Sequence, residues 1–277
     1  MPRPWTLLDS TDTDEGALEL RRRGDADYMI SVGGRVLMTS MITRSELALA
    51  ELGTERVRQL RAPRVLIGGL GLGFTLRAAL DALPAQARVT VAELNPRVID
   101  WCRGPASAAA GGAALDRRVG FFVGDVTHEI ARVAEDPRAA RYDAILWDLY
   151  VGPADDHRAE RDPLYGTTSV RRTFQALSDG GTFAVWGESP TPSFLERLRK
   201  AGFEPRAVRT RGGGLHHIVF LADRAAAQRG APANRPAAQR GASTDRPVAQ
   251  RGASAHRPTA QRAPSLDRKP SRRRDPH

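Results

Sequence analysis

Cysteine is nearly absent from the sequence, with Cys102 the single one among 277 residues. One cysteine cannot form an internal disulfide, and it cannot supply a zinc site that needs several thiolates. Long apolar stretches are missing as well, because no run approaches the roughly 20 residues of a membrane-spanning helix. The opening residues, MPRPWTLLDSTDTDE, lack the apolar core of a signal peptide. We therefore expect a cytoplasmic protein with no membrane segment and no bound metal.

Positive charge is in excess, but only in one segment. The chain has a net charge of +10, and residues 224–277 hold 13 basic and 3 acidic side chains. Residues 1–223 hold 29 of each sign, so this part is neutral overall. The net charge therefore says nothing about what the folded part binds. With 41% apolar residues, the chain can bury a substantial core.

The basic segment 224–277 is repetitive. The tripeptide Ala-Gln-Arg recurs every 11 residues, at 227–229, 238–240, 249–251 and 260–262. The repeats contain proline and no large apolar stripe, so they cannot offset the entropy lost on ordering, and we expect a disordered tail. Such a tail would contact nucleic acids or acidic surfaces only weakly and in a salt-dependent manner. A tail that grew by repeat expansion without a selected role is the interpretation we favour.

Residues 1–60 are expected to form a small β-rich segment followed by a linking helix. The runs Tyr28–Val32 and Arg35–Met38 are joined by Gly33-Gly34, which is typical of a hairpin with a primed turn. Thr43-Arg-Ser-Glu46 has the spacing of a capping box and precedes an apolar pattern of helical period.

Residues 61–223 alternate between strand and helix patterns. Helices are expected near 73–83, 96–103, 127–134, 166–178 and 191–201. Strands are expected at 64–68, 88–92, 119–123, 143–147 and 182–186, with a closing pair near 204–210 and 215–222. This order predicts an α/β domain with a doubly wound, mostly parallel, seven-stranded Rossmann-like sheet. Ligands of such sheets bind at the carboxyl ends of the strands.

A glycine motif follows the first of these strands. Gly69, Gly71 and Gly73 form G-x-G-x-G, which lets the backbone approach a nucleoside closely. Glu93 ends the next strand, at the spacing where a carboxylate accepts hydrogen bonds from ribose hydroxyls. Tight packing between strand and helix is the alternative reason for the glycines. A phosphate-binding P-loop is excluded, because no Gly-Lys-Ser/Thr follows.

The third strand end separates two classes of nucleoside ligand. NAD and S-adenosylmethionine both fit the glycine motif and Glu93. Asp125, in Gly124-Asp125, can accept a hydrogen bond from an adenine amino group, which favours S-adenosylmethionine. Asp125 can also cap the helix that begins near Thr127, and the two roles are compatible.

Five segments together resemble one family. In order they are VLIGGLGLGFTLRAAL, VTVAELNPRVIDW, VGDVTHEI, YDAILWDLYVGP and LYGTTSVRRTFQALSDGGTFAVW. They resemble spermidine synthases, the polyamine aminopropyltransferases, over roughly residues 15–222. The resemblance implies the class I methyltransferase-like fold behind a small β segment, commonly in a homodimer. It also implies a donor that is S-adenosylmethionine or its decarboxylated form, and a small acceptor such as an amine.

The chain departs from that family where charge matters. The family's aspartate in the glycine loop, which holds the donor's propylamine, corresponds to Leu72, and the second aspartate after the fourth strand corresponds to Val151. The first of those two aspartates is retained as Asp148, the candidate catalytic residue. Tyr150 and Tyr165 flank the pocket in the family's layout and are candidate acceptor-binding residues.

These observations predict a transferase that uses S-adenosylmethionine or its decarboxylated form without a metal. Methyl transfer is favoured, because Leu72 and Val151 can neither hold an amine nor remove its proton. A genuine polyamine aminopropyltransferase is the first alternative, and a catalytically silent nucleoside-binding protein is the second. An NAD-dependent oxidoreductase is disfavoured by Gly124-Asp125.

Overall fold

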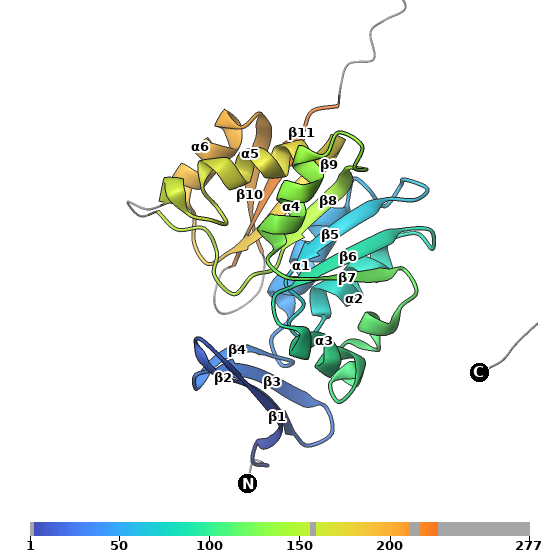
Figure 1. The fold of residues 1–277 in the computed structure, drawn as a ribbon, viewed down its shortest axis with the longest axis vertical. Coiled ribbons are helices and arrows are strands. Elements are labelled where there is room, and N and C mark those ends of the chain that lie inside the picture. Colours follow the sequence, from blue (N-terminus) through green and yellow to red (C-terminus); the bar gives the residue numbers. More distant parts are fainter. Residues whose placement is uncertain (1–2, 156–158, 211–216, 227–277) are drawn as a thin grey trace, which may run out of the picture. The chain divides into compact units, whose positions relative to one another are not determined.

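The computed structural model describes residues 3–155, 159–210 and 217–226 (Figure 1). Residues 227–277 of the expected tail lie outside the described residues, so its disorder stays a prediction. The described residues contain two sheets, one of four strands and one of seven.

The four-stranded sheet is an antiparallel meander in the order β1-β2-β3-β4. Its strands are β1 (Thr6–Thr13), β2 (Gly16–Arg23), β3 (Asp27–Val32) and β4 (Arg35–Thr39). The predicted hairpin is β3–β4, and Gly33 and Gly34 have the positive φ angles, 53° and 80°, that a primed turn needs. The hairpin β1–β2 was not predicted, because β1 is mostly polar and has no fully buried residue.

Helix α1 (Arg44–Thr54) begins where the sequence predicts, but the prediction of a capping box at its start is wrong. Thr43 occupies the N-cap position, and its side chain makes no capping hydrogen bond. Glu46 is instead buried, at 8% exposure, and accepts a hydrogen bond of 2.7 Å from the Ser45 hydroxyl. A carboxylate drawn into the interior cannot also reach back to the exposed start of its helix.

The seven-stranded sheet has the order β10-β11-β9-β8-β5-β6-β7. Its strands are β5 (Arg64–Gly68), β6 (Arg88–Glu93), β7 (Val119–Val123), β8 (Tyr142–Trp147), β9 (Leu177–Gly187), β10 (Phe203–Arg209) and β11 (Ile218–Arg224). The pairs from β9 through β7 are parallel, and only β10 and β11 are added antiparallel. The predicted mostly parallel, seven-stranded, doubly wound sheet is confirmed.

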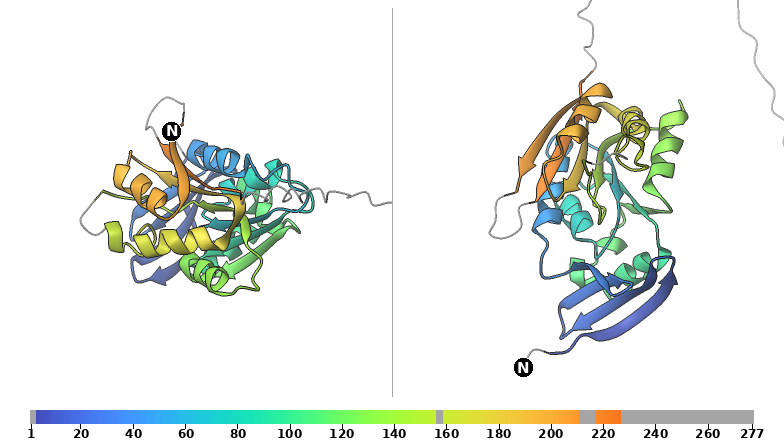
Figure 2. Two further views of the ribbon diagram at one scale, coloured as in Figure 1. Left: turned by 90° about the horizontal axis from the view of Figure 1, so that it is seen from above. Right: turned by 90° about the vertical axis from the view of Figure 1, so that its left-hand side faces the viewer.

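Helices cover both faces of this sheet (Figure 2). They are α2 (Phe74–Ala82), α3 (Pro96–Arg103), α4 (Val126–Glu135), α5 (Thr167–Ala176) and α6 (Pro192–Lys200). One apolar cluster joins α1, α2 and α3 to one face of the sheet, and a second joins α4, α5 and α6 to the other. Strand residues alternate between the clusters, with Ile67 in the first and Leu66 in the second.

The small N-terminal sheet shares the first of these cores. Leu20 and Ile30 belong to the same cluster as Leu49 of α1 and Leu76 of α2. A polar contact adds to this packing, since the Trp101 indole of α3 donates a 2.7 Å hydrogen bond to Asp9 of β1. The β-rich segment therefore packs against the same part of the chain that carries the glycine motif.

Candidate active site

The glycine motif lies between β5 and α2, and all three glycines have left-handed φ angles between 51° and 86°. A side chain at Gly69 would collide with the backbone carbonyl of Asp148, and one at Gly71 would collide with the Met38 sulfur of β4. The Leu72 amide also faces that sulfur, at 3.0 Å. Two of the glycines therefore have a packing reason, the alternative that the sequence left open.

Glu93 lies at the carboxyl end of β6, directly beside the glycine loop. It is 9% exposed, and its two oxygens accept hydrogen bonds of 2.9 Å from the backbone amides of Leu70 and Asn95. Burial raises the pKa of Glu93, although these backbone hydrogen bonds act in the opposite direction. A carboxylate has about four acceptor positions, so each oxygen can accept a further hydrogen bond, for instance from a ribose hydroxyl.

Asp125 is the N-cap of α4, which confirms the capping role. Its Oδ1 accepts hydrogen bonds from the backbone amide and the hydroxyl of Thr127, both at 2.7 Å. Within the described residues, its Oδ2 has no hydrogen-bond partner. One oxygen therefore holds the helix start, while the other can accept from a ligand at the carboxyl end of β7.

Asp148 follows β8, and its backbone amide donates to the Gly68 carbonyl at 2.9 Å. The Thr75 hydroxyl of α2 donates to Asp148 Oδ2 at 2.6 Å. Burial raises the pKa of Asp148 to about 7, the Thr75 hydrogen bond lowers it, and the negative charge of Glu46 raises it. A carboxyl group with a pKa near neutral can take up and release a proton at physiological pH.

Sequence reasoning missed two members of this cluster. Thr75 follows the glycine motif by two positions, and Glu46 belonged to the expected capping box. Both lie close to Asp148, because α1 and α2 pack side by side against the sheet. Thr75 could have been found from its position in the first turn of the helix after the glycines. No sequence pattern indicated that Glu46 lies near the candidate active site.

The two tyrosines have different surroundings. Tyr150 is 51% exposed, and its hydroxyl donates to Glu15 at 3.1 Å. Tyr165 is buried, its hydroxyl donates to the Val151 carbonyl at 2.7 Å, and its ring packs edge-on against Trp147 at 5.4 Å. These contacts account for both side chains without a ligand, so acceptor binding by Tyr150 and Tyr165 stays a prediction.

Leu72 and Val151, at the two positions that lack the family's carboxylates, differ in their exposure to solvent. Leu72 is 1% exposed and belongs to the first apolar core, whereas Val151 is half exposed. Cys102 lies near the same loop, and its thiol donates to the Gly71 carbonyl at 3.1 Å. Burial and then the charge of Glu93 raise the pKa of Cys102 to about 12, so the thiol stays protonated and is a poor nucleophile.

Neither a metal site nor a membrane span is found in the part of the chain that the structure describes. Among residues 3–155, 159–210 and 217–226, no group of three His, Cys, Asp or Glu side chains could hold a metal ion. No helix in these ranges is long and apolar enough to cross a membrane.

Comparison with known proteins gives matches among solved structures only. No protein-family model and no curated protein matches the sequence. A spermidine synthase in complex with the transition state analogue AdoDATO is 18% identical, with a TM-score of 0.58 over 78% of this chain and 72% of that chain. A spermidine synthase from Thermotoga maritima gives the same values. A probable spermidine synthase from Corynebacterium glutamicum is 17% identical, with a TM-score of 0.57 over 78% of this chain and 79% of that chain. The chain therefore has a spermidine-synthase-like fold, as its sequence motifs predicted.

Proposed function

We propose that this protein is a transferase that uses S-adenosylmethionine or its decarboxylated form as donor. The observation that carries the proposal is the placement of three carboxylates around one glycine loop. Glu93 is the last residue of β6, and Asp125 and Asp148 follow β7 and β8. These strands lie on either side of β5 in the sheet. Ligands of doubly wound sheets bind at this edge.

Each carboxylate has a distinct task in this proposal. Glu93 accepts hydrogen bonds from the ribose hydroxyls, and Asp125 accepts one from the adenine amino group through its free Oδ2. Asp148 takes the proton from the acceptor as the acceptor's nitrogen attacks the carbon bound to the donor's sulfonium. The carbon–sulfur bond then breaks, and its electron pair stays on the sulfur. Thr75 orients Asp148 through the 2.6 Å hydrogen bond.

Methyl transfer is the preferred reaction. Leu72 is buried in the apolar core, so this position of the glycine loop supplies no carboxylate to a propylamine. An ammonium group desolvated there without a partner would cost several kcal/mol. Aminopropyl transfer is the alternative, supported by the likeness to a spermidine synthase crystallised with AdoDATO. A small acceptor such as an amine, a homodimer, a cytoplasmic location and weak contacts of the basic tail all stay predictions.

Calorimetry with S-adenosylmethionine, its decarboxylated form and NAD tests the donor site. Glu93→Ala and Asp125→Asn should each weaken donor binding by about 1–3 kcal/mol. Asparagine caps helices about as well as aspartate, so Asp125→Asn separates ligand binding from helix stability. Glu135→Ala, at an exposed acid on α4, is the control and should bind as the wild type does. Unchanged affinity in both site variants would refute the assignment.

Product analysis tests the reaction. Each donor is supplied with a panel of amines, and S-adenosylhomocysteine or methylthioadenosine is measured. Methyl transfer yields the former, whereas efficient methylthioadenosine release with putrescine would make aminopropyl transfer the answer. Asp148→Asn should depress turnover far more than donor affinity. Tight donor binding without either product would identify a catalytically silent nucleoside-binding protein.

A further inference from the structure

A cavity of about 450 Å³ lies at the amino ends of β5, β6 and β7. The carboxylates of the candidate active site follow the opposite, carboxyl ends of parallel strands, so the two places are at opposite edges of the sheet. Four arginines line the cavity, namely Arg64, Arg88, Arg117 and Arg118. Among the described residues that line it, none is acidic.

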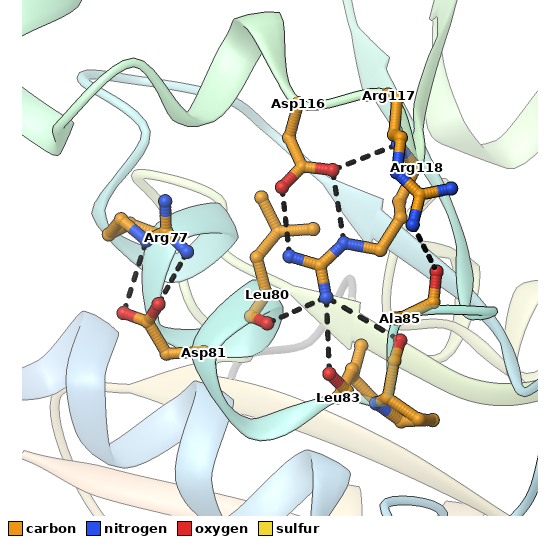
Figure 3. Close-up of polar contacts among 9 residues, drawn as sticks. Arg77, Leu80, Asp81, Leu83, Ala85, Asp116, Arg117 and Arg118 are labelled. Atoms are coloured by element: carbon orange, nitrogen blue, oxygen red, sulfur yellow. Dashed lines mark hydrogen bonds and ion pairs between the residues drawn. The ribbon is translucent and has the colours of Figure 1, made fainter.

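One of these arginines, Arg118, is held by several polar contacts (Figure 3). Arg118 makes a two-pronged ion pair with Asp116 at 3.0 and 2.8 Å. It also donates to the carbonyls of Leu80 and Leu83, at 2.8 and 3.1 Å, at the end of α2. Arg118 therefore joins α2 to the start of β7, and its donors are already in use.

The other three arginines have unused donors. Arg64 Nε is buried and has no hydrogen-bond partner, and its guanidinium lies 5.5 Å from the Tyr142 ring. Arg117 makes one long contact, at 3.4 Å, to the Ala85 carbonyl. In the described part of the chain, the Arg88 side chain has no ion pair or hydrogen bond. Arg88 and Arg117 are exposed and line the cavity, so their donors can reach an anion bound there.

Two acids near Arg64, Glu129 and Asp143, are hydrogen-bonded to other groups, although the charge of Arg64 also acts on Glu129. Glu129 accepts hydrogen bonds from Arg132 at 2.6 Å and from the Tyr142 hydroxyl at 2.5 Å. Asp143 accepts from the Arg64 backbone amide at 2.8 Å and from Ser178 at 2.7 Å. Neither carboxylate accepts a hydrogen bond from the guanidinium of Arg64.

We propose that this cavity binds a small molecule with two or more linked phosphate groups. Guanidinium groups match phosphate oxygens in paired hydrogen bonds, and three arginines with unused donors exceed what one phosphate needs. The volume is in the range of small-molecule sites.

Gly120 of β7 offers a way to block the site without disturbing the fold. It lines the cavity, and a Cβ added there would meet no atom within 4 Å. Gly120→Glu would therefore place a negative charge in the cavity, and Gly120→Gln is the neutral control of equal size. Arg88→Gln and Arg117→Gln remove the cationic donors. Arg138→Gln, at an exposed arginine outside the cavity, controls for the loss of one positive charge.

The experiment is calorimetry on the full chain in 150 mM salt with tripolyphosphate, ATP and orthophosphate as probes. The basic segment 224–277 is the same in all variants, so any anion binding by it is common to them. The wild type should bind tripolyphosphate at one site in addition to any binding by the tail, and Arg88→Gln, Arg117→Gln and Gly120→Glu should each weaken binding at this site about tenfold or more. Gly120→Gln should weaken it less than Gly120→Glu, and Arg138→Gln should match the wild type.

The candidate active site also accepts an adenosine group, so ATP binding counts for the cavity only where the cavity variants weaken it. Cavity-dependent ATP binding tighter than tripolyphosphate binding would identify a nucleotide, and equal affinities would show that the phosphate chain alone is recognised. Equal binding by the wild type and all cavity variants, with circular dichroism showing intact folds, would overturn it. Orthophosphate binding as tightly as tripolyphosphate would overturn the requirement for linked phosphates. An oligonucleotide that binds tighter than ATP and is weakened by the same substitutions would show a nucleic-acid surface instead.

Discussion

Replacing Asp148 by asparagine should remove a pH-dependent loss of stability. The ordinary pKa of this carboxyl group is 3.8, and burial raises it to about 7 in the folded chain. Below pH 3.8 the group is protonated in both states and has no effect. Between these values the unfolded chain releases the proton while the folded chain keeps it, so the free energy of unfolding falls as the pH rises. Three pKa units correspond to about 4 kcal/mol, an upper limit that is reached above pH 7.

The asparagine side chain would keep an oxygen that accepts from Thr75, so Asp148→Asn removes the titration with little change of shape. Urea unfolding at pH 4.5, 6 and 8 should show the variant gaining stability over the wild type as the pH rises. Thr75→Val removes the hydrogen bond that lowers the pKa of Asp148, so it should extend the loss to higher pH. Asp12→Asn, at an exposed aspartate of β1, is the control. Parallel pH curves for wild type and Asp148→Asn would refute the raised pKa and its cause.

Three further outcomes are expected. Gly71→Ala adds a side chain at a residue with a left-handed φ angle, against the Met38 sulfur, so thermal unfolding should show a loss of about 1–3 kcal/mol in stability. An unchanged stability would mean that the loop and Met38 can move to accommodate the methyl group. Trp101→Phe removes the hydrogen bond that most lowers the pKa of Asp9 and also reduces a buried ring, so the melting temperature of the variant should fall at pH 7. The difference from the wild type should narrow as acid protonates Asp9, and a constant difference would contradict the role of the hydrogen bond. Cys102, whose pKa is about 12, should resist iodoacetamide at pH 8 until the chain is denatured, and rapid labelling of the folded protein would show an accessible thiolate.

The sequence by itself determined the seven-stranded sheet. Parallel strands are buried on both faces, so they appear as short apolar runs, and every predicted strand after residue 61 corresponds to one from β5 to β11. The glycine motif, Glu93 and Asp125 could also be found, because each directly follows such a strand. The β1–β2 hairpin escaped, since TLLDSTDT carries no strand signal and is ordered by pairing with β2.

Only the tertiary structure decided which polar side chains meet. Thr75 and Asp148 are 73 positions apart and become hydrogen-bonded because α2 follows β5, which pairs with β8 in the sheet. Glu46 has the spacing of a helix cap, yet burial directs its charge towards Asp148. The arginine cavity collects residues from 64 to 142 at one edge of the sheet. Local patterns encode how a segment buries its apolar side, whereas the environment of a charge depends on distant segments that fold against it.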